Sequence, residues 1–167
     1  VDEEEAAVVR IRTSRACPIG FAPQVPFVLN DTVRENVVFG RAFDGARYDA
    51  VLDACALRVD LAQLPAGDAT EVGERGVTLS GGQKARPGLA RVLYACNAAE
   101  LVLLDCVLSA VDADTGRRIF DALFVGERGL LRGKTVLLCE NQLQYLEAAD
   151  HVVVLEGGRV RERGAPH

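Results

Sequence analysis

Leu79-Ser-Gly-Gly-Gln83 is the stretch that decides the fold, because a helical pattern follows it at once and extends to about Ala95. Ser80 supplies a hydroxyl at the start of this helix, and the two glycines let another object approach the backbone closely. Free N–H groups and the positive end of the helix dipole favour an anion there. The simpler interpretation is a loop with an N-cap serine, and these five residues alone leave both interpretations open.

A buried strand that ends in a carboxylate follows, Leu101-Val-Leu-Leu-Asp105. The carboxyl edge of a parallel sheet is where α/β proteins bind ligands, and an aspartate there typically holds Mg²⁺ beside nucleotide phosphates. An aspartate after a strand can also simply begin a turn or cap a helix. Its place downstream of the serine–glycine stretch favours the ligand-binding interpretation.

Two further apolar runs, Ile19–Ala22 and Thr135–Cys139, also predict strands. Strands without polar alternation, separated by helices, are typical of a parallel sheet covered on both faces. The predicted fold class is therefore α/β. The other expected elements are a strand at 8–12, a helix over 33–39 capped by Asn30-Asp31, helices over 48–55 and 57–64, an exposed loop over 66–78, a helix from near Asp112, a short helix over 142–149 and a hairpin around Gly157-Gly158.

Composition excludes several classes of function. The 167 residues include 19 Lys or Arg and 24 Asp or Glu, for a net charge of -5, so no basic excess is present to neutralise nucleic-acid phosphates. No apolar run approaches the roughly 20 residues that a membrane span needs, so we expect no direct membrane insertion by this segment. The start at Val1 and the lack of Met suggest a piece of a longer product.

Several more motifs occur in a specific order. They are Pro23-Gln24, Thr32–Asn36 with Phe39-Gly40, Val72–Gly76, Leu79–Gln83 with Lys84-Ala-Arg86 and Leu89-Ala-Arg91, Leu101–Asp105, Leu108–Asp112 and Gly133–Thr135. This set resembles the nucleotide-binding domain of an ATP-binding-cassette (ABC) transporter, and in particular the first such domain of the C subfamily, the multidrug-resistance-associated exporters. The resemblance covers roughly residues 19–164.

The resemblance implies the C-terminal part of a P-loop ATPase core with a mostly parallel sheet. Residues 19–24 and 99–164 would form this core, and residues 31–95 would be an inserted helical subdomain that carries the signature. Within it, residues 31–76 match the part that docks on the coupling helices of the transporter. The whole chain, 1–167, would then be a partial nucleotide-binding domain.

Residue roles follow from the resemblance only. Gln24 and Asp105 match the Q-loop and Walker B residues that contact Mg²⁺, and Asp112 matches the D-loop aspartate at the dimer interface. Ser80, Gly81, Gly82 and Gln83 match the signature that contacts the γ-phosphate of ATP held by the opposite domain. Two positions depart from the family, because Cys106 stands at the catalytic glutamate position and Asn141 at the switch histidine position. For each of these residues the alternative is an ordinary loop or cap residue.

Other departures weaken catalysis. No G-x-x-x-x-G-K-[ST] loop occurs upstream of Gln24, so we expect weak or absent ATP binding by the isolated chain. Neighbouring negative charge should raise the pKa of Cys106, and losing a general base typically costs on the order of 10²–10⁴ in rate. Asn141 cannot carry charge, and Glu140 adds a negative charge. Pro87 lies inside the signature helix, where it costs about 3 kcal/mol or introduces a kink.

Three functions remain in competition. The first is a transporter domain at the cytoplasmic face of a multi-pass membrane protein, which couples ATP and Mg²⁺ binding and hydrolysis to export and offers its signature to a second nucleotide-binding domain. The second is a degenerate, catalytically inactive module that acts only through domain pairing. Soluble ABC proteins of translation or DNA repair fit less well, because Thr32–Gly40 and Leu108–Asp112 are exporter-like.

Overall fold

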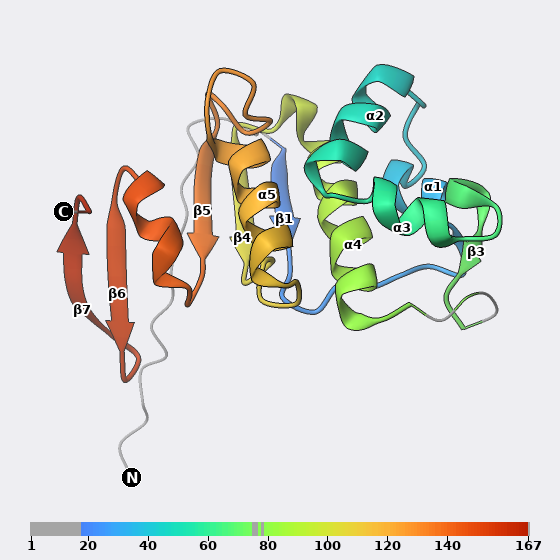
Figure 1. The fold of residues 1–167 in the computed structure, drawn as a ribbon. Coiled ribbons are helices and arrows are strands. Elements are labelled where there is room, and N and C mark those ends of the chain that lie inside the picture. Colours follow the sequence, from blue (N-terminus) through green and yellow to red (C-terminus); the bar gives the residue numbers. More distant parts are fainter. Residues whose placement is uncertain (1–17, 75–76, 78, 167) are drawn as a thin grey trace, which may run out of the picture.

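The computed structural model describes residues 18–74, 77 and 79–166. The strand expected at 8–12 lies outside the described residues. The chain is built from a parallel sheet, a group of helices beside it and a hairpin near the C-terminus (Figure 1).

The central sheet contains β1 (Ile19–Ala22), β4 (Leu101–Asp105) and β5 (Thr135–Cys139), in the order β1-β4-β5. All neighbours are parallel, with Ala22 opposite Leu104 and Asp105 opposite Cys139. The three apolar runs thus form strands at their expected positions, and the predicted α/β class is confirmed. The register brings the carboxyl ends of β1, β4 and β5 to one edge of the sheet.

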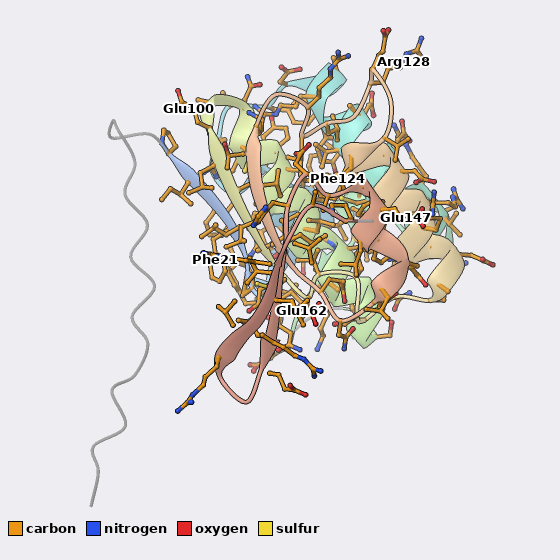
Figure 2. All side chains as sticks on the ribbon, turned by 90° about the vertical axis from the view of Figure 1, so that its left-hand side faces the viewer. Phe21, Glu100, Phe124, Arg128, Glu147 and Glu162 are labelled. Carbon is orange, nitrogen blue, oxygen red and sulfur yellow. The ribbon has the colours of Figure 1, made fainter. Side chains whose placement is uncertain are left out.

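Helices cover only one face of this sheet in the part of the chain that the structure describes. Val102 and Leu104 are buried on that face, towards α4 (Gly81–Ala95) and α5 (Ala113–Phe124). On the other face Phe21 is 54% exposed and Leu137 is 52% exposed. Figure 2 shows Phe21 on one side of the sheet and Phe124, at the end of α5, on the other. The expectation of cover on both faces is therefore wrong for the described residues, which supply helices to one face alone.

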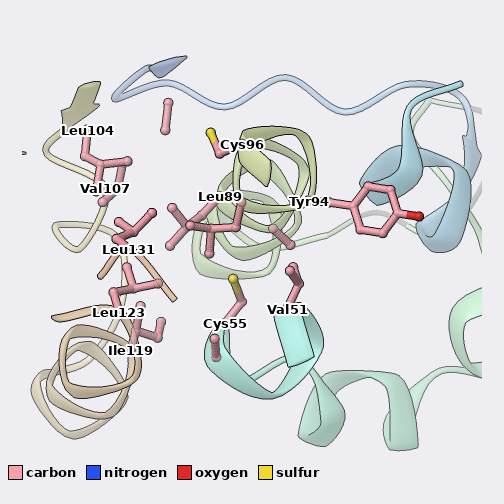
Figure 3. Packing of buried hydrophobic residues seen from close by; sticks show 14 of the residues in the cluster. Val51, Cys55, Leu89, Tyr94, Cys96, Leu104, Val107, Ile119, Leu123 and Leu131 are labelled. Carbon is pink, nitrogen blue, oxygen red and sulfur yellow. The ribbon is translucent and has the colours of Figure 1, made fainter. Parts of the chain in front are cut away.

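The core lies between the sheet, α4, α5 and α2 (Gly45–Ala54) (Figure 3). Leu104 from β4, Leu89 from α4, and Ile119 and Leu123 from α5 are each at most 3% exposed. Burying one such side chain contributes about 1.5–3 kcal/mol, so this cluster helps to hold α4 and α5 on the sheet. The α4 helix continues through Pro87, which is itself buried, so the helix is not broken there.

The helical part contains several short elements. They are β2 (Asp31–Thr32), α1 (Val33–Val38), α2, α3 (Arg58–Gln63), the 3₁₀ turn η1 (Gly67–Ala69) and β3 (Glu71–Val72). Of these, α1 and α2 pack against α4. The predicted loop at 66–78 is only partly correct, because Asp31 pairs with Val72 in an antiparallel two-stranded sheet. Val72 is 1% exposed, so this segment contributes to a second small core with Val33 and Leu79.

The start of α1 differs from its prediction. The N-cap is Thr32, whose Oγ1 accepts a hydrogen bond from the Glu35 backbone N at 3.1 Å. Asn30-Asp31 is therefore the wrong cap, because the Asn30 and Asp31 side chains accept hydrogen bonds from the Glu74 and Thr32 backbone N atoms instead. The helix ends at Val38, one residue earlier than predicted, where Phe39 adopts a left-handed conformation with φ 51°.

The C-terminal segment follows β5. It contains the 3₁₀ helix η3 (Leu143–Ala148), β6 (Val152–Glu156) and β7 (Arg159–Gly164), and a further 3₁₀ turn, η2 (Cys96–Ala98), precedes β4. Antiparallel β6 and β7 confirm the predicted hairpin, with Gly157 and Gly158 at φ 57° and 75°. Both values lie in the left-handed region that a type I′ turn requires. The segment at 142–149 is helical as expected, but it is 3₁₀ rather than α.

Candidate functional site

Ser80 is the N-cap of α4. Its Oγ accepts a hydrogen bond from the Gln83 backbone N at 3.3 Å, and Gln83 Oε1 accepts one from the Ser80 backbone N at 3.0 Å. This reciprocal capping box fixes the first turn of the helix. Ser80 and Gly81 are both exposed. The cap therefore faces outward, and the hydroxyl proton of Ser80 is not used by any residue that the structure describes.

Gly82 contacts the turn that leads to Asp112. A β-carbon on Gly82 would lie 2.9 Å from the carbonyl oxygen of Ala110, whereas one on Gly81 would meet nothing within 4 Å. Asp112 is the exposed N-cap of α5, and its Oδ1 accepts a hydrogen bond from the Thr115 backbone N at 2.9 Å. That hydrogen bond holds the pKa of Asp112 below its usual range. The structure thus brings two of the predicted segments together, and gives Asp112 an ordinary capping role as well.

Gln24, Asp105 and Cys106 lie at the carboxyl edge of the sheet. Gln24 is exposed just beyond β1, and Asp105 is the half-buried last residue of the neighbouring strand β4. Gln24, Cys106 and Ala110 line one small cavity of about 60 Å³. This volume is far below that of a typical ligand pocket. The predicted place of Asp105 at this edge is confirmed, but the described residues enclose no nucleotide-sized space there.

Cys106 follows β4 in a left-handed conformation, with φ 48°, and its backbone N donates to the Cys139 carbonyl oxygen at 2.9 Å. Burial raises the pKa of the thiol, and the nearby carboxylates of Glu140 and Asp105 raise it further. The direction agrees with the expectation from sequence. The group therefore stays protonated near neutral pH and is a poor proton acceptor.

Asn141 is exposed just after β5, and its backbone N donates to Glu140 Oε1 at 2.9 Å. The other carboxylate oxygen of Glu140, Oε2, is buried and has no hydrogen-bond partner among the described residues. Glu140 thus places a negative charge close to Cys106.

Known proteins with similar sequences settle the family. The chain is 50% identical over 146 residues to multidrug resistance protein mrp-7 of Caenorhabditis elegans, which is 87% of the chain and 9% of that protein. It is 49% identical over 147 residues to human ATP-binding cassette sub-family C member 10, which is 88% of the chain and 10% of that protein. The chain belongs to the C subfamily of ABC transporters. No family model matches the sequence.

This C-subfamily chain spans about a tenth of the length of the curated relatives that it matches. A third relative, the pleiotropic ABC efflux transporter of multiple drugs YBT1 of Candida glabrata, is 49% identical over 89% of the chain and 9% of its own length. Within the residues that the structure describes, no helix is long and apolar enough to cross a membrane.

The C-subfamily relatives imply ATP and Mg²⁺. In the described ranges no group of three or more His, Cys, Asp or Glu side chains is placed to hold a metal ion. Asp105 and Gln24 could each supply one oxygen, which suits Mg²⁺ only if phosphates and water complete its octahedron. The 167 residues contain no phosphate-binding loop, so these residues do not suffice for a nucleotide site by themselves.

The sequence of this C-subfamily chain gives no direct sign of one buried polar group, the guanidinium of Arg91. Arg91 on α4 is only 6% exposed, and burial lowers its pKa. Its guanidinium donates to Asn36, which is completely buried. An arginine inside a helix is ordinarily placed on the exposed face, so only the apolar residues one turn away on the same helix, Pro87 and Tyr94, could have signalled its burial.

Proposed function

We propose that this chain is part of a nucleotide-binding domain that couples ATP binding and hydrolysis to export, and that its signature acts on ATP held by a second nucleotide-binding domain. The observation that carries the proposal is the outward-facing cap at Ser80 packed through Gly82 against Ala110. This contact puts the signature and the turn before Asp112 on one surface, which a facing domain can cover.

The chemistry of the cap suits a phosphate. The Ser80 Oγ accepts from the Gln83 N–H, so its own O–H proton is free to donate to a phosphate oxygen. The backbone N–H groups of Gly81 and Gly82 start a helix of 15 residues, whose positive end favours an anion. To form a competent site, the partner domain then needs to supply only the phosphate-binding loop.

The chain's own half-site would be slow. Gln24 and Asp105 would contact Mg²⁺ there, Cys106 would stand in place of the catalytic glutamate and Asn141 in place of the switch histidine. The raised pKa of the Cys106 thiol supports a weak role for this residue, since a protonated thiol cannot accept a proton from water. Hydrolysis would therefore take place at the site that the signature completes in trans.

Docking on the transmembrane domains of the transporter is supported by an exposed apolar patch beside Gln24. We call Val25, Phe27, Leu29 and Phe39 the docking patch; their exposed fractions are 80%, 53%, 42% and 39%. The rings of Phe27 and Phe39 meet edge to face with centroids 6.0 Å apart. Such a patch marks a surface that a partner covers. The domain would then lie at the cytoplasmic face of the membrane.

A degenerate module that only pairs with another domain is the second candidate, and Cys106 and Asn141 favour it. The two candidates differ in whether the Ser80 cap contacts nucleotide. The test is ATP-dependent association of the chain with a second nucleotide-binding domain of the same transporter, one that carries the phosphate-binding loop. Size-exclusion chromatography with and without ATP measures the association. Ser80→Arg should abolish the complex, whereas Gln144→Arg, on the exposed surface of η3, should not. Association that ignores both nucleotide and Ser80→Arg would favour the degenerate module.

A further inference from the structure

Arg91 is a buried cation that no described carboxylate neutralises within ion-pair distance. Its Nε donates to the Asn36 carbonyl oxygen at 2.7 Å, one terminal nitrogen to Asn36 Oδ1 at 2.9 Å, and the other to the Phe27 carbonyl oxygen at 3.2 Å. These three bonds join three segments, namely α4, α1 and the loop after β1. A buried charge persists only where such bonds compensate its lost hydration.

Two aromatic rings complete the enclosure of this guanidinium. Its central carbon lies 4.1 Å from the centroid of the Phe27 ring and 4.7 Å from that of Phe39. Cations are attracted to the faces of aromatic rings, more strongly when water is excluded. Arg91 thus holds together two members of the docking patch that belong to different segments.

Asn36 extends the connection further along the loop. Its Oδ1 accepts from the Leu29 backbone N at 2.8 Å, and its Nδ2 donates to the carbonyl oxygens of Leu29 at 3.1 Å and Thr32 at 2.9 Å. Asn36 Oδ1 also accepts from Arg91. Removing the arginine side chain therefore loosens the Asn36 side chain and, with it, the hydrogen bond from the Leu29 N–H.

A separate contact brings the same loop against α4. A β-carbon on Gly88 would lie 2.8 Å from Cβ of Pro26, so helix and loop touch with no room for a side chain. Gln24 lies two residues before Pro26, and Ser80 starts the same rigid helix that carries Gly88 and Arg91. The loop therefore has little freedom to move without α4.

We infer that Arg91 is a positioning residue that fixes the Gln24 loop and the Phe27–Phe39 pair of the docking patch in one arrangement set by the signature helix. A displacement of α4 then moves Ser80, Gln24 and the docking patch together. Arg91 orders the loop whatever the chain does. Only the role of this connection in coupling nucleotide binding to transport rests on the proposed function.

The test is amide hydrogen exchange in the 167-residue chain, with Arg91→Met and a matched control, Arg86→Met. Arg86 lies on the same helix, but its guanidinium bonds to Asp60 on α3. Arg91→Met should raise the exchange rate of the Leu29 amide at least tenfold relative to core amides of α5. Arg86→Met should leave Leu29 unchanged. Arg91→Lys, which keeps charge but cannot reach three acceptors in a fixed fork, should fall between wild type and Arg91→Met.

A measurement on the wild-type chain covers the case in which Arg91→Met does not fold. The Arg91 Nε–H and the Leu29 N–H should exchange through the same opening, with equal opening free energies across denaturant concentrations. The inference is overturned if Leu29 opens without Arg91, if its rate in Arg91→Met rises no more than that of the α5 amides, or if Arg86→Met has the same effect.

Discussion

The carbonyl oxygen of Ala110 lies 2.9 Å from the place that a β-carbon on Gly82 would occupy. The backbone of the signature helix therefore comes very close to the backbone of the turn before Asp112, and the glycine is required by this approach rather than by an unusual φ. The contact fixes how the Ser80 cap is oriented relative to the start of α5.

Gly82→Ala should consequently destabilise the fold by about 1–3 kcal/mol, because the new methyl group would overlap the Ala110 carbonyl. Gly81→Ala is the matched control, since nothing lies within 4 Å of its β-carbon position and alanine is the better helix former. Urea unfolding of the two variants measures the difference. Equal stabilities would show that the Gly82–Ala110 contact is looser than described.

Pro87→Val should stabilise the chain by about 1–3 kcal/mol. Valine restores a backbone N–H that can donate to the Gln83 carbonyl oxygen, and it has a volume similar to that of the buried proline. The melting temperature and the urea midpoint should both rise. An unchanged or lowered melting temperature would mean that packing around Pro87 outweighs the missing hydrogen bond.

Cys106 should react with iodoacetamide at a pH midpoint above the value of about 8.5 for a free thiol, because burial and the charges of Glu140 and Asp105 raise its pKa. The thiol is therefore mostly protonated at pH 7. Glu140→Gln removes one charge and should lower the midpoint. Mass spectrometry of the alkylated peptide resolves this site from the other cysteines, with a free cysteine peptide as reference. A midpoint at or below that of the peptide would contradict the assignment.

Asp68 should make stability depend on pH in the acid range. Burial raises the pKa of this carboxyl, but hydrogen bonds from Arg34 at 2.9 Å and Tyr48 at 3.1 Å outweigh it, so the net pKa is lowered. A lowered folded-state pKa stabilises the protein above the unfolded value of about 3.9, and this contribution disappears as the pH falls through the folded value.

Asp68→Asn should therefore cost roughly 0.5–1 kcal/mol at pH 7, since Arg34 is half exposed and solvent screens the pair, and the difference should vanish at the acid end. Asp53→Asn is the control, because Arg58 keeps its second partner Asp49. Urea midpoints from pH 7 to pH 2 give both curves. A gap between Asp68→Asn and wild type that persists at pH 2 would exclude this linkage.

The elements that the sequence predicts correctly are those whose position depends on residues close to them in the chain. The apolar run at Leu101–Asp105 and the serine before α4 fixed the positions of both elements, because each is set by neighbouring residues. The glycine pair at 157–158 gave the hairpin for the same reason. The pairing of β2 with β3 was not predictable, since each strand has two residues and their contact is between distant parts of the chain.

In the candidate site, too, features set by neighbouring residues were predictable and features set by distant contacts were not. The sequence places Asp105 and Gln24 at strand ends, and the parallel register then brings those ends together. The cap of α1 was missed because three adjacent polar residues, Asn30, Asp31 and Thr32, can all cap, and which of them does so depends on the residue at which the helix begins. Arg91 was missed because its burial depends on rings and carbonyl groups from two other segments.

Steady-state ATP turnover tests the central claim most directly. The purified chain alone should show no activity above background, since it has no phosphate-binding loop and carries Cys106 after Asp105. A partner nucleotide-binding domain from the same transporter should hydrolyse ATP faster as wild-type chain is added, and the Ser80→Arg variant should give no increase. The account is contradicted if the wild-type chain gives no stimulation, if Ser80→Arg stimulates equally, or if the chain alone turns over ATP in a Mg²⁺-dependent manner.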